Sequence, residues 1–341
     1  MDKSNLWQAW PIAGPWHLSP LSGGTNSSVW RAEATDGQRY VLRLIPSISH
    51  IPRIRYEAAL LEALANRQLP FALPLPLKAR NGDIVVLFEQ EAGTQAFAIL
   101  THLLSGSLLD RNDISLATHG GSTLAWLDHE LAALPETCIP QGNQLLQTFG
   151  QLACCHSLVP DPLMAVEQLP ISREQAKQIQ HILATVMETV DSLYQELPQQ
   201  LLHCDYGPGN ILVHEKQITA VLDFEFAGVD LRVLELCVAL SWWPVNLLGT
   251  GQEWSIMDAF GSAYISHFPL SEEELLASPS IWRLRDATSF VHRMGRYMAG
   301  LETDARIQDR VQHSLWREQW LVAHQEKLVQ HALKWGKGKK T

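Results

Sequence analysis

The sequence has few charged residues and no surplus of positive charge. Charged residues make up 18% of 341 positions, against 46% hydrophobic residues, so the chain can fill a sizeable core and extensive disorder is not expected. Acidic residues outnumber basic ones, 36 to 26, and the net charge of −10 argues against nucleic acid or an anionic membrane as partners. The length suits two domains or one two-lobed domain.

Cysteines and long apolar runs are also scarce. The five cysteines are odd in number and have no C-x-x-C spacing, so neither a disulfide framework nor a zinc site is expected. No uncharged apolar stretch reaches ~18 residues, the length needed to span a membrane. Residues 1–16 lack the basic region and apolar run of a signal peptide. These absences predict a cytoplasmic protein with reduced thiols. The sequence also has no internal repeat.

What the sequence does contain is one informative run, residues 201–225. Residues 211–213 and 218–222 are apolar and partly β-branched, which predicts two strands. Because only a short turn at residues 215–217 separates them, the strands are expected to pair as a hairpin. Asn210, at the start of one strand, is then expected beside Asp223, at the end of the other.

Three polar side chains are therefore expected to converge. Asp205 and Asp223 offer carboxylates and Asn210 an amide oxygen, which are ligands that suit magnesium. The order His203-x-Asp205, then Asn210, then Asp223 is typical of kinases, in which the first aspartate is catalytic and the later Asn and Asp bind metal. The alternative is a tight loop over a buried hairpin, with acids that only face water.

This run resembles the aminoglycoside phosphotransferase family, which is related to choline, fructosamine, methylthioribose and type II homoserine kinases. The family motif is His-Gly-Asp-x-x-x-x-Asn followed by Ile-Asp-Phe or Ile-Asp-Trp; here Cys204 stands in place of the glycine, and Leu222-Asp223-Phe224 forms the second part. The resemblance implies ATP and Mg²⁺ as cofactors. It also implies that Asp230 anchors the end of the metal-binding segment.

The fold expected from this resemblance is α+β and bilobal, like a protein kinase. Residues 1–103 are predicted to form a small nucleotide-binding lobe with an antiparallel sheet. Residues 104–341 are predicted to form a mostly helical lobe that carries the catalytic loop, 203–210, and the metal-binding segment, 223–225.

A glycine-rich run near the start of the chain is a candidate phosphate-binding loop. Gly23, Gly24 and Asn26 precede a strand, and Asp36-Gly37 marks a hairpin turn before a return strand. Small residues let backbone N–H groups approach phosphate. The run does not follow G-x-G-x-x-G, so an ordinary turn stays an alternative.

Arg43 lies on the return strand among apolar neighbours, where a cation needs a partner. Kinases place a phosphate-binding lysine at this position, paired with a glutamate on a helix. Pro52 begins a predicted helix that carries Glu57, the expected partner, and Glu62, an alternative. Otherwise Arg43 would be a surface residue of an edge strand.

Further elements follow from periodicity and capping patterns. Two more strands are expected at residues 84–88 and 95–101, and residues 1–20 are expected to pack on the first lobe. An apolar helical stripe is expected at Leu124, Leu127, Leu131 and Leu134. Capping boxes are expected at Ser172 with Gln175 and at Ser271 with Glu274.

Several residues have two interpretations. Trp242 and Trp243 either line an acceptor pocket or belong to the core, and Glu225 is a candidate metal or substrate contact. The arginines of the C-terminal helices either bind an acidic substrate group or, as the pattern favours, pair with surface acids; they are Arg283, Arg285, Arg293 and Arg296.

The sequence thus predicts an ATP-dependent phosphotransferase that acts on a hydroxyl of a small molecule. Asp205 is expected to orient the hydroxyl, with His203 fixing the loop. The acceptor class stays open among aminoglycosides, homoserine, choline and sugars. The alternative is a non-catalytic nucleotide-binding protein on a kinase-like fold. A protein substrate is disfavoured, because no Ala-Pro-Glu and no long activation segment follow Asp223.

Overall fold

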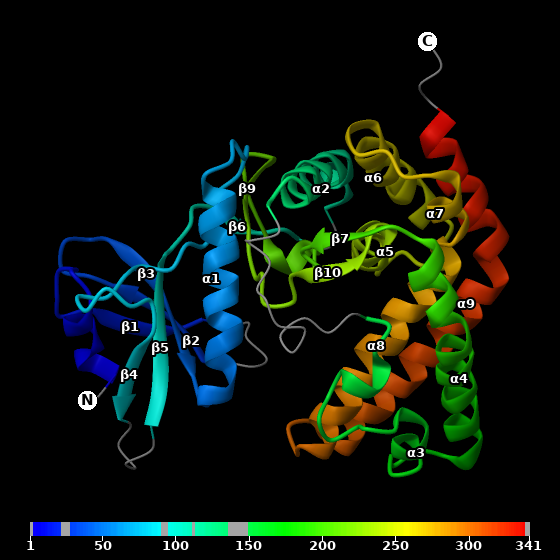
Figure 1. Ribbon diagram of the computed structural model, residues 1–341, viewed down its shortest axis with the longest axis horizontal. Coiled ribbons are helices and arrows are strands. Elements are labelled where there is room, and N and C mark those ends of the chain that lie inside the picture. Colours follow the sequence, from blue (N-terminus) through cyan, green and yellow to red (C-terminus); the bar gives the residue numbers. More distant parts are fainter. Residues whose placement is uncertain (1–2, 22–27, 90–94, 111–112, 136–148, 338–341) are drawn as a thin grey trace. The chain divides into compact units, whose positions relative to one another are not determined.

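The computed structural model describes residues 3–21, 28–89, 95–110, 113–135 and 149–337. These residues fall into two units (Figure 1). Unit 1 takes the described residues of Met1–Leu108, Leu134–Gln141 and Ile211–Glu225. Unit 2 takes those of Leu109–Ala133, Gly142–Asn210 and Phe226–Thr341. The division into lobes of residues 1–103 and 104–341 stays a prediction.

Unit 1 contains a five-stranded antiparallel sheet in the order β1-β2-β3-β5-β4. Its strands are β1 (His17–Pro20), β2 (Ser28–Glu33), β3 (Arg39–Ile45), β4 (Val86–Glu89) and β5 (Gln95–His102). The turn between β2 and β3 contains Gly37 at φ 83°, a value that glycine adopts without strain, and confirms the predicted hairpin. Arg43 lies on the central strand of this sheet, so the edge-strand alternative is wrong.

Alternate residues of β3 point to opposite faces of the sheet, and other residues pack on each face. On one face Tyr40, Leu42 and Leu44 join a core cluster with Leu6 of the 3₁₀ helix η1 (Lys3–Ala9) and with Trp10, which follows it, as predicted for residues 1–20. On the other face Ile45 packs with residues of α1 (Ile51–Ala65). Proline in the first turn of α1 confirms the predicted helix start.

A second, three-stranded sheet in unit 1 contains the predicted hairpin. Its order is β6-β8-β9, with β6 (Ser107–Leu108), β8 (Ile211–His214) and β9 (Gln217–Val221). Glu215 and Lys216 form the turn at φ 48° and 62°, the positive values that a two-residue I′ turn requires. The turn is therefore one residue shorter than predicted.

Unit 2 is mostly helical. Its helices are α2 (Ala117–Ala132), α3 (Pro162–Val166), α4 (Arg173–Glu196), α5 (Arg232–Trp242), α6 (Glu253–His267), α7 (Glu272–Leu276), α8 (Ser278–Met298) and α9 (Asp304–Lys337). Two strands, β7 (Gln199–Leu202) and β10 (Gly228–Leu231), pair antiparallel. Sequence reasoning missed both, because four residues are too few for a clear alternation. Short 3₁₀ turns lie at η2 (Ile48–His50), η3 (Ile114–Leu116), η5 (Leu152–Cys154) and η6 (Pro208–Asn210).

The signals for helix starts are confirmed, and one predicted helix end is corrected. Capping boxes begin α4 at Ser172 and α7 at Ser271. In α2 the predicted stripe is buried except at Leu134, which lies beyond the last helical residue, Ala132. No helix in the described part of the chain is both long and apolar enough to cross a bilayer.

Candidate active site

The catalytic-loop candidate in unit 2 begins directly after β7 and is held by its own polar side chains. The backbone N–H of Asp205 donates to Nδ1 of the fully buried His203 at 3.2 Å. Nδ2 of Asn210 donates to the Asp205 carboxylate at 2.9 Å and to the Asp205 carbonyl at 2.9 Å. Because the amide nitrogen of Asn210 is used in this way, its amide oxygen is the atom available to a cation.

Cys204 occupies a conformation that usually belongs to glycine. Its φ is 66°, in the left-handed region, and its side chain is buried. A side chain in this region costs about 1 kcal/mol relative to glycine. The family motif has glycine at this position, so the structure gives a physical reason for that preference.

A buried acid that sequence reasoning missed holds the loop backbone. Glu235 of α5 is 0% exposed, and its Oε2 accepts the N–H of Cys204 at 2.8 Å. Burial raises the pKa of Glu235 to about 7, although the backbone N–H groups of Cys204, His203 and Tyr206 oppose the shift by favouring the charged form. A lone acid inside the apolar run 233–243 was the available signal, since a buried charge needs partners.

Asp128 of α2 is a second buried acid near Glu235. Its carboxylate accepts the hydroxyl of Tyr264 at 2.6 Å. Burial and the charge of Glu235 raise its pKa well above the ordinary value. One oxygen of each acid, Oδ1 of Asp128 and Oε1 of Glu235, is buried without a hydrogen-bond partner among the described residues. Burial therefore disfavours the charged form of both acids.

Asp230 is a buried acid whose hydrogen bonds lie within unit 2; its predicted role of anchoring the end of the metal-binding segment stays a prediction. Its buried carboxylate accepts the Tyr194 hydroxyl and the Phe149 N–H, both at 2.6 Å. Burial raises its pKa to about 6, while these hydrogen bonds oppose the shift. Asp230 thereby ties β10 to α4 and to the segment that precedes η5.

The two tryptophans at the end of α5 have different surroundings. Trp243 is 3% exposed and packs against Phe260 with ring centroids 5.1 Å apart, as expected for a core residue. Trp242 is only partly buried and lies against the catalytic loop, since a Cβ on Gly207 would come 3.1 Å from its Cδ1 atom. Glycine at this position permits the close approach.

In unit 1, Arg43 pairs with Glu57 as predicted. The guanidinium Nη2 lies 2.7 Å from Oε2 of Glu57, whereas Glu62 is exposed. Burial disfavours the charged guanidinium, but Glu57, Glu225 and Asp223 outweigh that effect and raise the pKa of Arg43. The strand thus holds a permanent cation beside several carboxylates.

Asp223 lies at the end of the hairpin in unit 1, two residues after Val221, which pairs with Ile211. Its φ is 62°, and its Oδ1 is buried without a hydrogen-bond partner among the described residues. Burial raises its pKa, and Arg43 opposes that shift. The Glu225 carbonyl accepts a hydrogen bond from Nε of Arg53. A partly buried acid with an unsatisfied oxygen suits a cation ligand.

The convergence of Asp205, Asn210 and Asp223 stays a prediction, because the residues divide between the two units. Within the described ranges, no group of three or more His, Cys, Asp or Glu side chains forms a metal site. Gly23, Gly24 and Asn26 lie outside the described residues.

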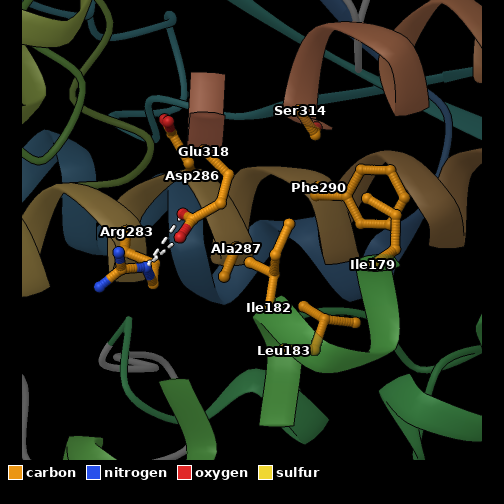
Figure 2. A pocket seen from close by; sticks show the side chains of 9 residues that line it. All are labelled: Ile179, Ile182, Leu183, Arg283, Asp286, Ala287, Phe290, Ser314 and Glu318. Carbon is orange, nitrogen blue, oxygen red and sulfur yellow. Dashed lines mark hydrogen bonds and ion pairs between the residues drawn. The ribbon is translucent and has the colours of Figure 1, made fainter. Parts of the chain in front are cut away.

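One small cavity in unit 2 lies among α4, α8 and α9 (Figure 2). Isoleucine and leucine side chains of α4 face Phe290 and the paired Arg283 and Glu318, which lie 2.8 Å apart. Its volume of about 20 Å³ holds roughly one water molecule, so it is too small for an acceptor.

Comparison with protein families gives a match over most of the chain. The model of the phosphotransferase enzyme family matches residues 17–254. A homoserine kinase of Polaromonas naphthalenivorans is 26% identical over 273 residues, 78% of each chain. A homoserine kinase of Phenylobacterium zucineum is 24% identical over 82% of this chain and 79% of its own.

Solved structures have the same fold at low sequence identity. An amicoumacin kinase in complex with AMP-PNP, Ca²⁺ and Ami superposes with a TM-score of 0.66, 15% identity and 91% coverage of each chain. A microcompartment-associated aminopropanol kinase gives 0.62, 17% identity, and coverage of 97% of this chain and 98% of its own. The predicted kinase-like α+β fold is therefore confirmed.

Proposed function

Because this chain belongs to the phosphotransferase enzyme family and is a small-molecule kinase, we propose that it transfers the γ-phosphoryl group of ATP to an acceptor hydroxyl. Asp205 orients the hydroxyl and accepts its proton, and His203 and Asn210 fix the position of Asp205. The observation that carries this assignment is the hydrogen bonding of the loop. His203 and Asn210 both bond to Asp205, and the buried Glu235 accepts a backbone N–H of the loop. Positioning is the main contribution a kinase makes.

Magnesium is part of the proposal. Asn210 and Asp223 would hold it, and the fit rests on the unsatisfied Oδ1 of Asp223 and the available amide oxygen of Asn210. When bound, the metal neutralises charge on the transferring phosphate. Glu225 is a further candidate contact for metal or substrate.

The nucleotide is assigned to the lobe of residues 1–103. Arg43 clamps the phosphates, and Glu57 sets the orientation of its guanidinium. Gly23, Gly24 and Asn26 are candidates for backbone contacts to phosphate. We place the reaction in the cytoplasm, where ATP is abundant.

Homoserine is the first acceptor to test. Relatives named homoserine kinase align over about four fifths of the chain. Their identity near 25% leaves room for another small alcohol of the same class.

The test is ADP release from Mg-ATP with homoserine, 3-aminopropan-1-ol, choline, simple sugars and aminoglycosides, for the native protein and Asp205→Ala. We expect turnover with one class and its loss in the variant, while Mg-ATP binding measured by calorimetry persists. Equal turnover by native protein and variant would remove Asp205 from the mechanism. Tight ATP binding without turnover of any acceptor would favour the non-catalytic alternative.

A further inference from the structure

Arg285 of α8 is a buried cation whose hydrogen-bonding capacity is largely unused. Its side chain is 10% exposed, and its Nη1 lies 3.0 Å from the Asp286 carboxylate. Its Nε and Nη2 donate no hydrogen bond to any residue that the structure describes. Burial lowers the pKa of Arg285 from its usual value, and Asp286 opposes the shift. An arginine fork with free donors in such a place suits a carboxylate ligand.

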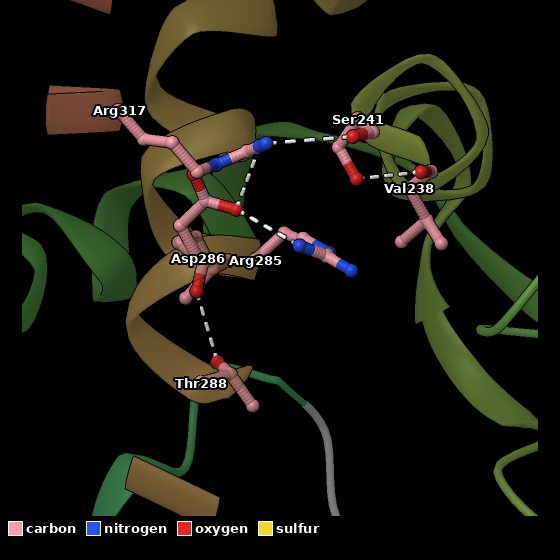
Figure 3. Close-up of polar contacts among 7 residues, drawn as sticks. Val238, Ser241, Arg285, Asp286, Thr288 and Arg317 are labelled. Carbon is pink, nitrogen blue, oxygen red and sulfur yellow. Dashed lines mark hydrogen bonds and ion pairs between the residues drawn. The ribbon is translucent and has the colours of Figure 1, made fainter. Parts of the chain in front are cut away.

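The neighbouring Arg317 of α9 differs in this respect. It donates through Nε and Nη2 to Asp286 at 2.6 and 3.0 Å, and through Nη1 to the carbonyl of Ser241 at 3.4 Å. Figure 3 shows both arginines around the single carboxylate of Asp286, with the guanidinium of Arg285 extending past it. Asp286 is thus largely satisfied by Arg317, and Arg285 keeps donors for another partner.

The position of Arg285 connects it to the catalytic loop. Its guanidinium lies over the ring of Trp242, 4.6 Å from the centroid, and the same tryptophan lies against Gly207. The negative charge of Asp205 favours the charged form of Arg285 and so opposes the lowering of its pKa. Trp242 therefore contacts both this cation and the loop that carries the proposed base.

The other arginines of α8 pair with glutamates, and none of them is described as stacking on Trp242. Arg283 pairs with Glu318 at 2.8 Å, and Arg293 and Arg296 both lie within 3.4 Å of Glu302. These ion pairs agree with the pairing that the sequence favoured, although Arg285 and Arg296 are buried rather than on the surface.

We propose that Arg285 binds the carboxylate of the acceptor, so that the enzyme selects a small hydroxy acid or hydroxy amino acid. The proposal rests on the proposed phosphotransfer at Asp205. Trp242 forms one wall of the acceptor site and holds the guanidinium plane by stacking, while Asp286 fixes its other edge. A carboxylate that accepts two N–H groups of Arg285 would direct the acceptor hydroxyl toward Asp205.

The test compares homoserine with 3-aminopropan-1-ol, which has the same hydroxyl and amine but no carboxylate. The variants are Arg285→Gln and Arg285→Lys, with Arg283→Gln as the matched control two residues away. We expect the native protein to prefer homoserine in kcat/KM, and Arg285→Gln to lower that preference by roughly 100-fold. Arg285→Lys should recover part of it, because charge remains without the fork. Arg283→Gln should keep it.

Calorimetric titration of homoserine into the protein with AMP-PNP bound provides a second readout, and circular dichroism checks folding. The proposal is overturned if Arg285→Gln lowers kcat/KM equally for both acceptors, since the residue would then serve phosphate or structure. It is also overturned if the native protein phosphorylates only acceptors without a carboxylate, a result that leaves phosphotransfer itself intact. Absence of turnover with every acceptor would instead count against the proposed function.

Discussion

Arg43 in unit 1 and Arg285 in unit 2 are both largely buried, and the charges around them differ. Arg43 pairs with Glu57 and also feels the carboxylates of Asp223 and Glu225. Arg285 shares one carboxylate, Asp286, with a second arginine. The first cluster has an excess of negative charge and suits a metal cation, whereas the second has spare donors and suits an anion.

This comparison shows that a net-acidic chain contains two charge clusters of different character. The overall charge of −10 carries no information about either cluster. Buried charged groups are costly unless their hydrogen-bonding atoms are used, so an unused donor or acceptor on such a group indicates a missing partner. The predictions below test the two clusters and the loop that carries Asp205.

The largest expected effect is on chemistry at the loop. Asp205→Asn keeps the shape and removes the proton acceptor, so kcat should fall by roughly 10³-fold while Mg-ATP affinity changes little. Single-turnover kinetics and calorimetry measure the two quantities. A fall of less than tenfold would show that another group accepts the proton.

Removing the buried support of the loop should have the next largest effect. Glu235→Ala leaves the Cys204 N–H without its acceptor, and we expect kcat to fall by roughly 100-fold together with a loss of ~1–3 kcal/mol in the free energy of unfolding. Glu235→Gln retains an amide oxygen and should recover part of both. If Gln and Ala behave alike, the hydrogen bond is not what positions the loop.

The phosphate contact proposed for Arg43 is tested by ATP affinity. Arg43→Gln should raise KM for ATP by roughly 10- to 100-fold, because a charge-assisted contact to phosphate is worth about 1.5–3 kcal/mol. Arg43→Lys should recover much of the affinity, since kinases use lysine at this position. An unchanged KM in Arg43→Gln would leave the ion pair with Glu57 a purely structural role.

The buried acids of unit 2 predict a dependence of stability on pH. Burial raises the pKa of Glu235 to about 7 and of Asp230 to about 6, whereas unfolded carboxyls titrate near 4. The folded protein then holds extra protons between these values, so the free energy of unfolding should fall as pH rises from about 4 to 7. Urea unfolding at several pH values measures this slope. Glu235→Gln should flatten its upper part, and an identical slope in that variant would refute the assignment.

The smallest effect is expected at an exposed ion pair in unit 1. Arg55 lies 2.7 Å from Asp83, with side chains 51% and 34% exposed. Arg55→Gln should change the free energy of unfolding by less than ~1 kcal/mol and leave KM for ATP unchanged. It is the matched control for Arg43→Gln, and a large change in KM would mean that charge alone, without burial, governs nucleotide affinity.

The sequence predicted elements whose signals are local. The hairpin at residues 211–221, the turn at Gly37, the start of α1 and both capping boxes follow from strand composition, turn residues and helix caps. The pairing of Arg43 with Glu57 was also predicted, because the kinase arrangement specifies a strand cation and a helix acid. The short strands β7 and β10 were not predicted, since their pairing joins segments 26 or more residues apart in the chain.

The sequence by itself predicted the reaction class, because the order His203, Asp205, Asn210 and Asp223 along the chain is typical of kinases. Only the tertiary structure identified Glu235 as the support of the loop and distinguished Arg285 from the other arginines of α8. Both depend on burial and on which partners remain available, and these are set by packing between helices far apart in the sequence. A linear pattern records residue types and spacing, but it cannot record which hydrogen bonds are already made.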